Sequence, residues 1–278
     1  MSSTINFVGT PPFKGSFLPA LCDNKYGYVD DELNINIPFV FDWAFSFEGE
    51  VAKVMVDDKF GIIDRTGSFL ILPKFDAIDK FINGYSITRL KEKMGYISSN
   101  GIEVCPPTFV NAMPFNEGVA VVGQYGGMEY AEPDESMRIA LSSTGRSSKP
   151  TKGYYYNKVL YGSIDEAGNS LMEFKFLSLS DMKDGRHIAV NADENYIIVD
   201  RYGDIVSKDS YSNLMLIRNR FVLASKQVKN WLGHIKVKYG IINMDESPVT
   251  DFEFDSYSIE KDALVLKKND KVNLRLQY

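Results

Sequence analysis

The stretch KFGIIDRTGSFLILP, from Lys59 to Pro73, decides the fold of this chain, because its first half recurs along the sequence. The hexapeptide Lys59–Asp64 has four close counterparts, which read KYGYVD (Lys25–Asp30), KMGYIS (Lys93–Ser98), LYGSID (Leu160–Asp165) and KYGIIN (Lys238–Asn243). The first three glycines of this motif, Gly27, Gly61 and Gly95, lie 34 residues apart. A fixed period of this size is typical of a repeat protein, in which one small unit is stacked many times.

Each repeat unit is expected to contain a β-hairpin. A run of alternating apolar residues precedes the motif, as in EGEVAKVMV (Glu48–Val56), and this alternation predicts a strand. A short polar turn such as Asp57-Asp58 follows, and the motif itself is the returning strand. Seven such hairpins are predicted, at about residues 17–30, 50–64, 85–98, 119–164, 187–200, 221–243 and 263–276.

The remaining repeated residues are also explained by structure. The glycine inside the motif indicates a tight bend or a close approach of the neighbouring unit's backbone. The D-x-x-G pattern, as in Asp64–Gly67, specifies a turn, so its aspartates are interpreted as turn residues rather than catalytic ones. Prolines such as Pro73 are expected at a strand end or sheet edge, and the aromatic after them, as in Phe75, is expected in the core. Trp43, which lies between two such landmarks, is also expected in the core.

Composition excludes several classes of partner. The formal net charge is −6, which disfavours nucleic acids and anionic membranes, because phosphate binding needs clustered Lys and Arg. The N-terminal text has neither the basic nor the apolar region of a signal peptide, and no run is long enough to span a bilayer. The isolated cysteines Cys22 and Cys105 form no CxxC pair. We therefore expect a cytoplasmic protein.

No catalytic or cofactor-binding motif is found. His187 and His234 have no Cys, His or carboxylate neighbours at metal-ligand spacing, and nucleophile elbows, P-loops and dinucleotide-binding glycine patterns are lacking. The acidic pairs near Asp30 and Asp57 are interpreted as solvated turns. The sequence predicts a protein that is not an enzyme and that needs no cofactor or metal.

The places where the period fails are the better candidates for function. Inserts at about 124–158 and 226–237 interrupt the fourth and sixth hairpins, and inserts in repeat proteins often form the binding face. Exposed aromatic side chains are favoured interface anchors, and acidic ones suit a basic partner. The candidate partner-binding residues are Tyr125, Tyr130, Glu132, Asp134, Glu135, Tyr154, Tyr155, Tyr156 and Trp231.

The two landmarks together resemble the WG-repeat family, also called KWG repeats, whose unit looks like F-x-E-G-x-A-x-V followed by K-x-G-x-I-D-x-x-G and Pro. FNEGVAVV (Phe115–Val122) and Lys59–Pro73 are similar to this pattern, although Tyr26, Phe60, Met94, Tyr161 and Tyr239 replace the signature Trp. The resemblance implies an array of short antiparallel strands without enzyme activity or a fixed ligand. Members of the family are mostly bacterial, and some occur beside secreted toxins as immunity partners.

The sequence therefore predicts an all-β fold: an open, superhelical stack of about seven antiparallel hairpin repeats in a single domain over residues 1–278. A closed β-propeller is the alternative. The expected function is a non-enzymatic protein-binding scaffold, in its most specific form an immunity protein that neutralises a toxin with a basic domain. A carbohydrate or cell-wall binding module is the second hypothesis. A hydrolase is the third, and it would need carboxylates and a histidine clustered in one cleft.

Overall fold

The computed structural model of the chain describes residues 6–7, 17–131, 154–209, 211–218, 220–229 and 232–277. These residues form strands and turns, and no α-helix occurs among them. The chain groups into two compact units, Met1–Val122 with Ser163–Leu171 and Gly123–Gly162 with Met172–Tyr278. The prediction of one domain over the whole chain stays a prediction.

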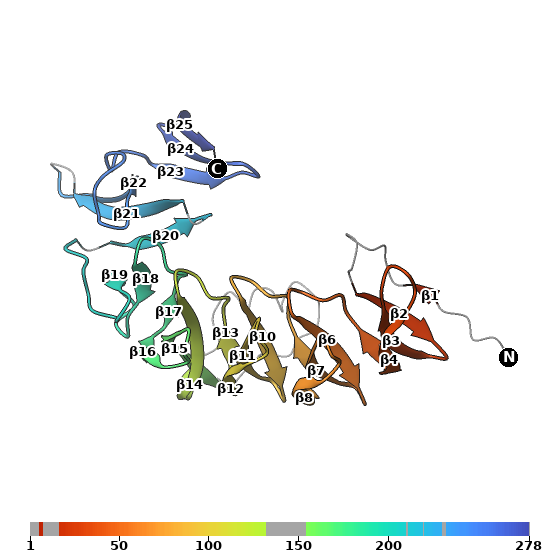
Figure 1. Ribbon diagram of the computed structural model, residues 1–278. Helices are drawn as coiled ribbons and strands as arrows, with labels where there is room; N and C mark the ends of the chain where they lie inside the picture. Colours follow the sequence, from red (N-terminus) through yellow and green to blue (C-terminus); the bar gives the residue numbers. More distant parts are fainter. Residues whose placement is uncertain are drawn as a thin grey trace, which may run out of the picture. The chain divides into compact units, whose positions relative to one another are not determined.

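The first three sheets have four strands each, in chain order (Figure 1). The first contains β1 (Asn6–Phe7), β2 (Leu18–Cys22), β3 (Lys25–Val29) and β4 (Ile35–Phe41). The second contains β5 (Trp43–Ala44), β6 (Val51–Val56), β7 (Lys59–Asp64) and β8 (Phe69–Phe75). The third contains β9 (Ala77–Ile78), β10 (Tyr85–Leu90), β11 (Lys93–Ser98) and β12 (Glu103–Phe109).

The later sheets follow the same plan with more variation. The fourth contains β13 (Asn111–Ala112), β14 (Val119–Ala131), β15 (Tyr154–Asp165) and β16 (Ser170–Phe176). The fifth contains β17 (Ser178–Leu179), β18 (Arg186–Val190) and β19 (Tyr196–Asp200), and the sixth β20 (Asn213–Ile217), β21 (Phe221–Lys229) and β22 (Ile235–Ile242). The seventh contains β23 (Ser256–Ile259), β24 (Ala263–Lys268) and β25 (Lys271–Gln277).

These seven small antiparallel sheets confirm the predicted all-β array of hairpin repeats. Each described strand is hydrogen-bonded only within its own sheet, so strand pairing closes no barrel or propeller ring in the described part of the chain. This pairing agrees with the predicted stack. All seven predicted hairpins match observed strand pairs within one or two residues at each end.

The motif glycines are required by a close backbone contact inside each sheet. A Cβ atom on Gly61 would lie 2.7 Å from the carbonyl oxygen of Ile71, and one on Gly27 would lie 2.6 Å from that of Ile37. Both carbonyl groups belong to the third long strand of the same sheet, where the ladder shifts register. The predicted close approach is therefore found, but it comes from the same sheet and not from the neighbouring unit.

The D-x-x-G aspartates are turn residues, as predicted. The Asp64 carboxylate accepts the backbone N–H groups of Thr66 at 2.8 Å and Ser68 at 3.0 Å, and Gly67 has a φ of 84°. The Thr66 hydroxyl also donates to this carboxylate, and these hydrogen bonds lower the pKa of Asp64. Asp165 and Asp200 accept the corresponding N–H groups in their own turns.

Consecutive sheets enclose the core between them. Between the first and second sheets, Tyr28 and Phe41 pack against Val54 and Ile63. Phe75 occupies the corresponding place one repeat later and is fully buried. The aromatic after the proline is therefore the core residue that the sequence predicts, and the same arrangement recurs around Phe254 in the sixth and seventh sheets.

The expectation that Trp43 lies in the core is wrong. Its side chain is 44% exposed, and its ring lies 4.9 Å from that of Tyr26. Side chains alternate between the two faces of a strand, and the neighbouring Ala44 takes the core position in β5. Trp43 must therefore point to the outer face, where it covers Tyr26.

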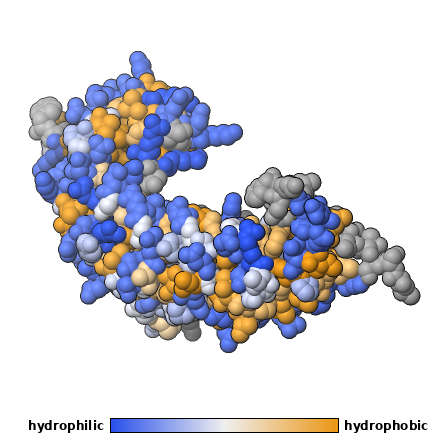
Figure 2. All heavy atoms as spheres, viewed as in Figure 1, coloured by the Kyte–Doolittle hydropathy of each residue, from blue (hydrophilic) through white to orange (hydrophobic). Residues whose placement is uncertain are grey.

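The third long strands form the outer edges of the first sheets and carry the prolines. Pro38, Pro73 and Pro107 lie inside β4, β8 and β12, each of which pairs with a strand on one side only. Proline cannot donate to a ladder, so it is tolerated at such an edge and discourages further pairing. Figure 2 shows apolar residues over β4 and β8, where Val40 and Leu72 are exposed.

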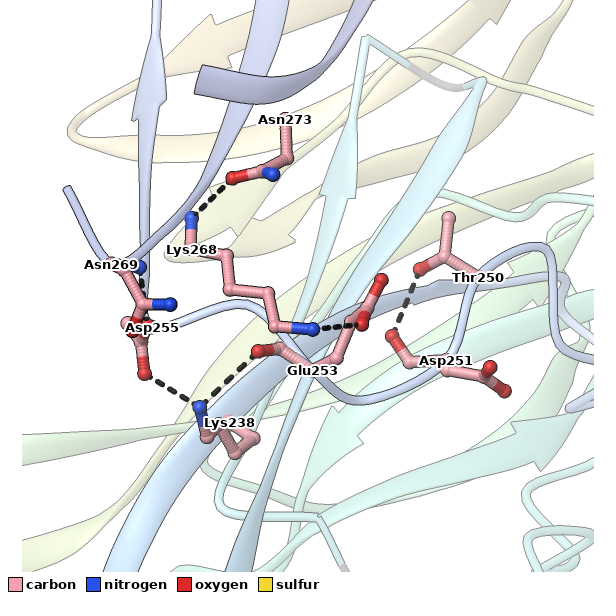
Figure 3. Close-up of polar contacts among 8 residues, drawn as sticks. All are labelled: Lys238, Thr250, Asp251, Glu253, Asp255, Lys268, Asn269 and Asn273. Atoms are coloured by element: carbon pink, nitrogen blue, oxygen red, sulfur yellow. Dashed lines mark hydrogen bonds and ion pairs between the residues drawn. The ribbon is translucent and has the colours of Figure 1, made fainter. Parts of the chain in front are cut away.

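A recurring ion pair lies beside the turn of the first two hairpins and at the equivalent position of the sixth. Lys25 pairs with Asp42 at 2.5 Å, Lys59 pairs with Asp76, and Lys238 pairs with Asp255 at 2.6 Å (Figure 3). The second oxygen of each carboxylate accepts a backbone N–H from the next hairpin turn, for example that of Asn269 at 2.8 Å. The aspartate thus joins one sheet to the next. This role was not predicted, although a Lys-to-Asp spacing of 17 residues recurs in the sequence.

Candidate binding surfaces

Both inserts enter the repeat at the same position, the turn between the two strands of a hairpin. Regular hairpins close in two residues, as at Asp57-Asp58, where both φ angles are positive. In the sixth hairpin, β21 and β22 stay paired from Val222↔Ile242 to Lys229↔Ile235. In the fourth, β14 and β15 run far beyond the regular length. The described part of each insert is therefore a two-stranded ribbon that continues its hairpin.

The extension of the fourth hairpin, here called the aromatic ribbon, consists of Gly123–Ala131 and Tyr154–Gly162. Four of its tyrosines face solvent, among them Tyr155, which is 67% exposed, and Tyr125, which is 55% exposed. Tyr130 and Tyr155 come from opposite strands, and their ring centroids lie 5.2 Å apart with the planes inclined by 60°. This pair places a large aromatic surface on the ribbon. The predicted role of Tyr125, Tyr130, Tyr155 and Tyr156 in partner binding stays a prediction.

A polar cluster joins the two strands beside these rings. Glu129 accepts hydrogen bonds from Lys158 at 2.6 Å and from the Tyr156 hydroxyl at 3.0 Å. The Lys158 ammonium is the main cause of a lowered pKa of Glu129, and Glu129 in turn raises the pKa of Lys158. These contacts fix the two strands relative to each other, so the aromatic side chains start from an ordered support.

Gly126 allows a second close contact between β14 and β15. A Cβ atom at this position would lie 2.5 Å from the Leu160 side chain, so only glycine lets Leu160 cross the ribbon here.

Several predicted partner-binding residues cannot be placed. Glu132, Asp134, Glu135 and Trp231 lie outside the described residues. The backbone of Tyr154 belongs to β15, and its side chain is also outside them.

The extension of the sixth hairpin, here called the lysine ribbon, consists of Lys226–Lys229 and Ile235–Lys238. Its strands carry four lysines and no carboxylate, although the whole chain has a net charge of −6. Val228 is 41% exposed, Val237 43% and Ile235 62%. Figure 2 shows apolar residues among hydrophilic ones over β21 and β22. This insert was predicted to bind a partner through Trp231, and its positive charge was not predicted to matter.

Groups suited to metal binding do not come together in the described residues, where no cluster of three His, Cys, Asp or Glu side chains occurs. His187 is fully buried in β18 and its Nδ1 lies 2.8 Å from the carbonyl oxygen of Ser180, which fits the structural role expected of it. Cys22 and Cys105 are free thiols and partly exposed, and burial raises the pKa of Cys105. No helix in the described part of the chain is long and apolar enough to cross a membrane.

Stacked hairpin sheets with a common glycine motif define a β-repeat protein. Residues 26–60, 60–93 and 94–127 each match the family model described as WG containing repeat. These three consecutive matches confirm the resemblance to WG repeats over residues 26–127. No curated protein matches the sequence significantly.

Similar solved structures share little sequence with this chain. BamB from Moraxella catarrhalis has a TM-score of 0.33 at 10% identity, covering 98% of this chain and 85% of its own. A eukaryotic initiation factor has a TM-score of 0.37 at 8% identity, covering 100% and 78%. The WD40 β-propeller domain of Doa1 has a TM-score of 0.29 at 10% identity, covering 98% and 96%. We base no conclusion on likenesses of this size.

Proposed function

We propose that this protein is a non-enzymatic scaffold that binds another protein through the aromatic ribbon. The observation that carries the proposal is the packed pair of Tyr130 and Tyr155 on an extension that regular repeats lack. Tyrosine gives a large, rigid and partly polar contact area at low entropic cost, so it is favoured at protein interfaces. The Glu129 cluster lowers that cost further, because it holds the two strands before a partner arrives.

In its most specific form, the partner is a bacterial toxin or effector with a basic surface, and this chain is its cytoplasmic immunity protein. The resemblance to WG repeats and the net charge of −6 support this version. Inhibition would be steric: the ribbon covers the partner's active surface, and the acidic field of the chain speeds the encounter.

The test is co-expression with the toxin-like product of a neighbouring gene, scored as growth rescue, together with the affinity of the purified pair by calorimetry. We expect the double variant Tyr130→Ala/Tyr155→Ala to weaken binding by about 100-fold and to abolish rescue, since interface tyrosines are commonly worth more than about 1 kcal/mol each. Tyr202→Ala is the matched control, because Tyr202 is 59% exposed in the turn after β19 and belongs to neither ribbon. Equal affinity of the double variant and the control would refute the proposal that the aromatic ribbon is the binding surface.

A carbohydrate ligand fits the aromatic ribbon less well. The rings of Tyr130 and Tyr155 are inclined to each other and form no single flat platform on which a sugar ring could lie. A glycan array probed with the purified chain separates the two functions: a specific glycan hit that is lost in Tyr130→Ala/Tyr155→Ala would favour the carbohydrate reading.

A further inference from the structure

We propose that the outer edge of β22, at Ile235–Lys238 in the lysine ribbon, accepts an extended acidic segment of a partner protein as an additional strand. This inference rests on the proposed function as a protein-binding scaffold. It concerns a different hairpin and names a different chemistry, an acidic peptide that pairs with backbone groups.

The edge is open because the segment that pairs with β22, through isolated bridges at Pro248 and Phe254, ends at the base of the ribbon. Tyr239 is the last residue of β22, counted towards the ribbon tip, that pairs outwards: its N–H donates to the Phe254 carbonyl at 2.9 Å. From Asp255 the chain continues into β23, which belongs to the next sheet. Outward-facing residues alternate along an antiparallel strand, so Val237 and Ile235 turn their N–H and C=O groups to the same edge. In the described residues, no other strand pairs with this edge.

The charge of the ribbon selects the partner. Lys226 is paired with Asp209, and Lys238 is held by Asp255 and by the carbonyl oxygen of Glu253 (Figure 3). Lys229 and Lys236 make no ion pair within the described residues and are both exposed. Lys236 lies on the edge strand and faces a carboxylate of an incoming strand, whereas Lys229, opposite Ile235 on β21, adds positive charge on the other face. Neither strand of the ribbon carries an acidic residue.

The faces of the ribbon predict the pattern of the bound segment. Lys236 points to one face, while Ile235 and Val237 point to the other. A strand added beside β22 would therefore place acidic side chains next to Lys236 and apolar ones next to Ile235 and Val237. Alternating acidic and apolar residues satisfy both. A second copy of the chain does not fit, because its lysines would lie against these, which is how lysines protect free edges from self-association.

The experiment measures binding of a labelled peptide of alternating Glu and Val to the full chain by fluorescence anisotropy. We expect saturable binding that weakens as salt is raised, and no binding of a matched Lys–Val peptide. Binding of the full chain to phosphatidylserine vesicles or single-stranded DNA, with no binding of the Glu–Val peptide, would overturn the proposal and identify the lysine ribbon as a surface for a different class of anion.

Two variants test the charge and the edge separately. Lys229→Glu/Lys236→Glu should weaken binding of the Glu–Val peptide at least about tenfold and create binding of the Lys–Val peptide. Val237→Pro removes one outward N–H without breaking the ladder to β21, and it should also weaken binding about tenfold. Lys236→Arg is the control that keeps charge and edge, and unchanged urea unfolding shows that each variant is folded.

Equal peptide affinity in all variants would refute the strand-addition site. The aromatic ribbon plays no part in this assay, so the result is independent of Tyr130→Ala/Tyr155→Ala. If the Glu–Val peptide does not bind, the proposed function of the aromatic ribbon is unaffected. If Tyr130→Ala/Tyr155→Ala does not weaken partner binding, the strand-addition site is still tested by the peptide assay.

Discussion

The second and sixth hairpins share one frame and differ at a single point. Each has the motif glycine and, two residues before it, the lysine of a Lys–Asp pair, formed by Lys59 with Asp76 and by Lys238 with Asp255. The second closes directly after Val56↔Lys59, whereas the sixth continues from the equivalent pair Lys226↔Lys238 into the lysine ribbon.

This difference shows which part of a repeat is free to change. The residues between the sheets are committed to the core, and the aspartate after the core aromatic is committed to the next sheet. The hairpin turn lies outside the core and meets the aspartate of the preceding sheet through one backbone N–H only, which any residue but proline supplies, so additional residues there cost the fold little. An array built in this way can acquire binding surfaces by lengthening hairpins while its stacking stays the same.

The largest expected effect concerns the motif glycines, and it separates the two hairpins. A Cβ atom would lie 2.7 Å from a carbonyl oxygen at Gly61 but 3.0 Å from one at Gly240. We therefore expect Gly61→Ala to lower the free energy of unfolding by about 3 kcal/mol and Gly240→Ala by about 1 kcal/mol. Urea unfolding of the two variants gives both values. Equal losses would mean that β8 in the second sheet yields as easily as the segment around Asp251 that lies beside β22.

A smaller effect concerns the Lys–Asp pair that the two hairpins share. The Lys59 ammonium and the Lys91 backbone N–H lower the pKa of Asp76, and Lys238 and Asn269 do the same for Asp255. A carboxyl whose pKa is lowered by folding stabilises the protein above its unfolded pKa, about 3.9, and loses this contribution as the pH falls below that value. Asp76→Asn and Asp255→Asn should each make acid destabilisation shallower below about pH 4.

The measurement is the urea midpoint as a function of pH. Asp58→Asn is the control, because Asp58 is an exposed turn residue of the second hairpin, and its slope should match that of the unchanged protein. If the urea midpoint of Asp76→Asn had the same pH dependence as that of Asp58→Asn, the contacts of Asp76 with Lys59 and Lys91 would not contribute to stability.

The repeat frame could be predicted from the sequence because its residues are under purely local constraints. Asp64 and Gly67 specify a turn wherever they occur, and alternation around Val54 specifies a strand, so period and hairpins follow from pattern alone. Trp43 could not be placed in the same way. Its outward position depends on Ala44 taking the inner face of β5. A strand of two residues is too short for alternation to show which residue faces inwards.

The candidate surfaces were predicted in position but only partly in chemistry. Breaks in the period located both ribbons, and tyrosine content identified the aromatic one. The expectation that both inserts suit a basic partner does not fit the lysine ribbon, because net charge describes the chain as a whole and not the segment from Phe221 to Ile242. The open edge of β22 depends on where Phe254 stops pairing, which no local pattern shows.

The smallest expected effect comes from removing the difference between the two hairpins. Replacing residues 227–237 by Asn-Gly joins Lys226 to Lys238 through a two-residue turn, which is the geometry of Val56 and Lys59 in the second hairpin. The removed strands contribute no residue to the buried clusters of the sixth sheet, and a shorter loop costs less entropy to close. The free energy of unfolding in urea should therefore change by less than about 0.5 kcal/mol, while binding of the Glu–Val peptide disappears.

The converse chimera, in which residues 227–237 replace Asp57-Asp58, should fold as well and carry the peptide site with it. A loss above about 2 kcal/mol in the shortened variant would show instead that the lysine ribbon supports the fold, and that the two hairpins differ in more than their turns.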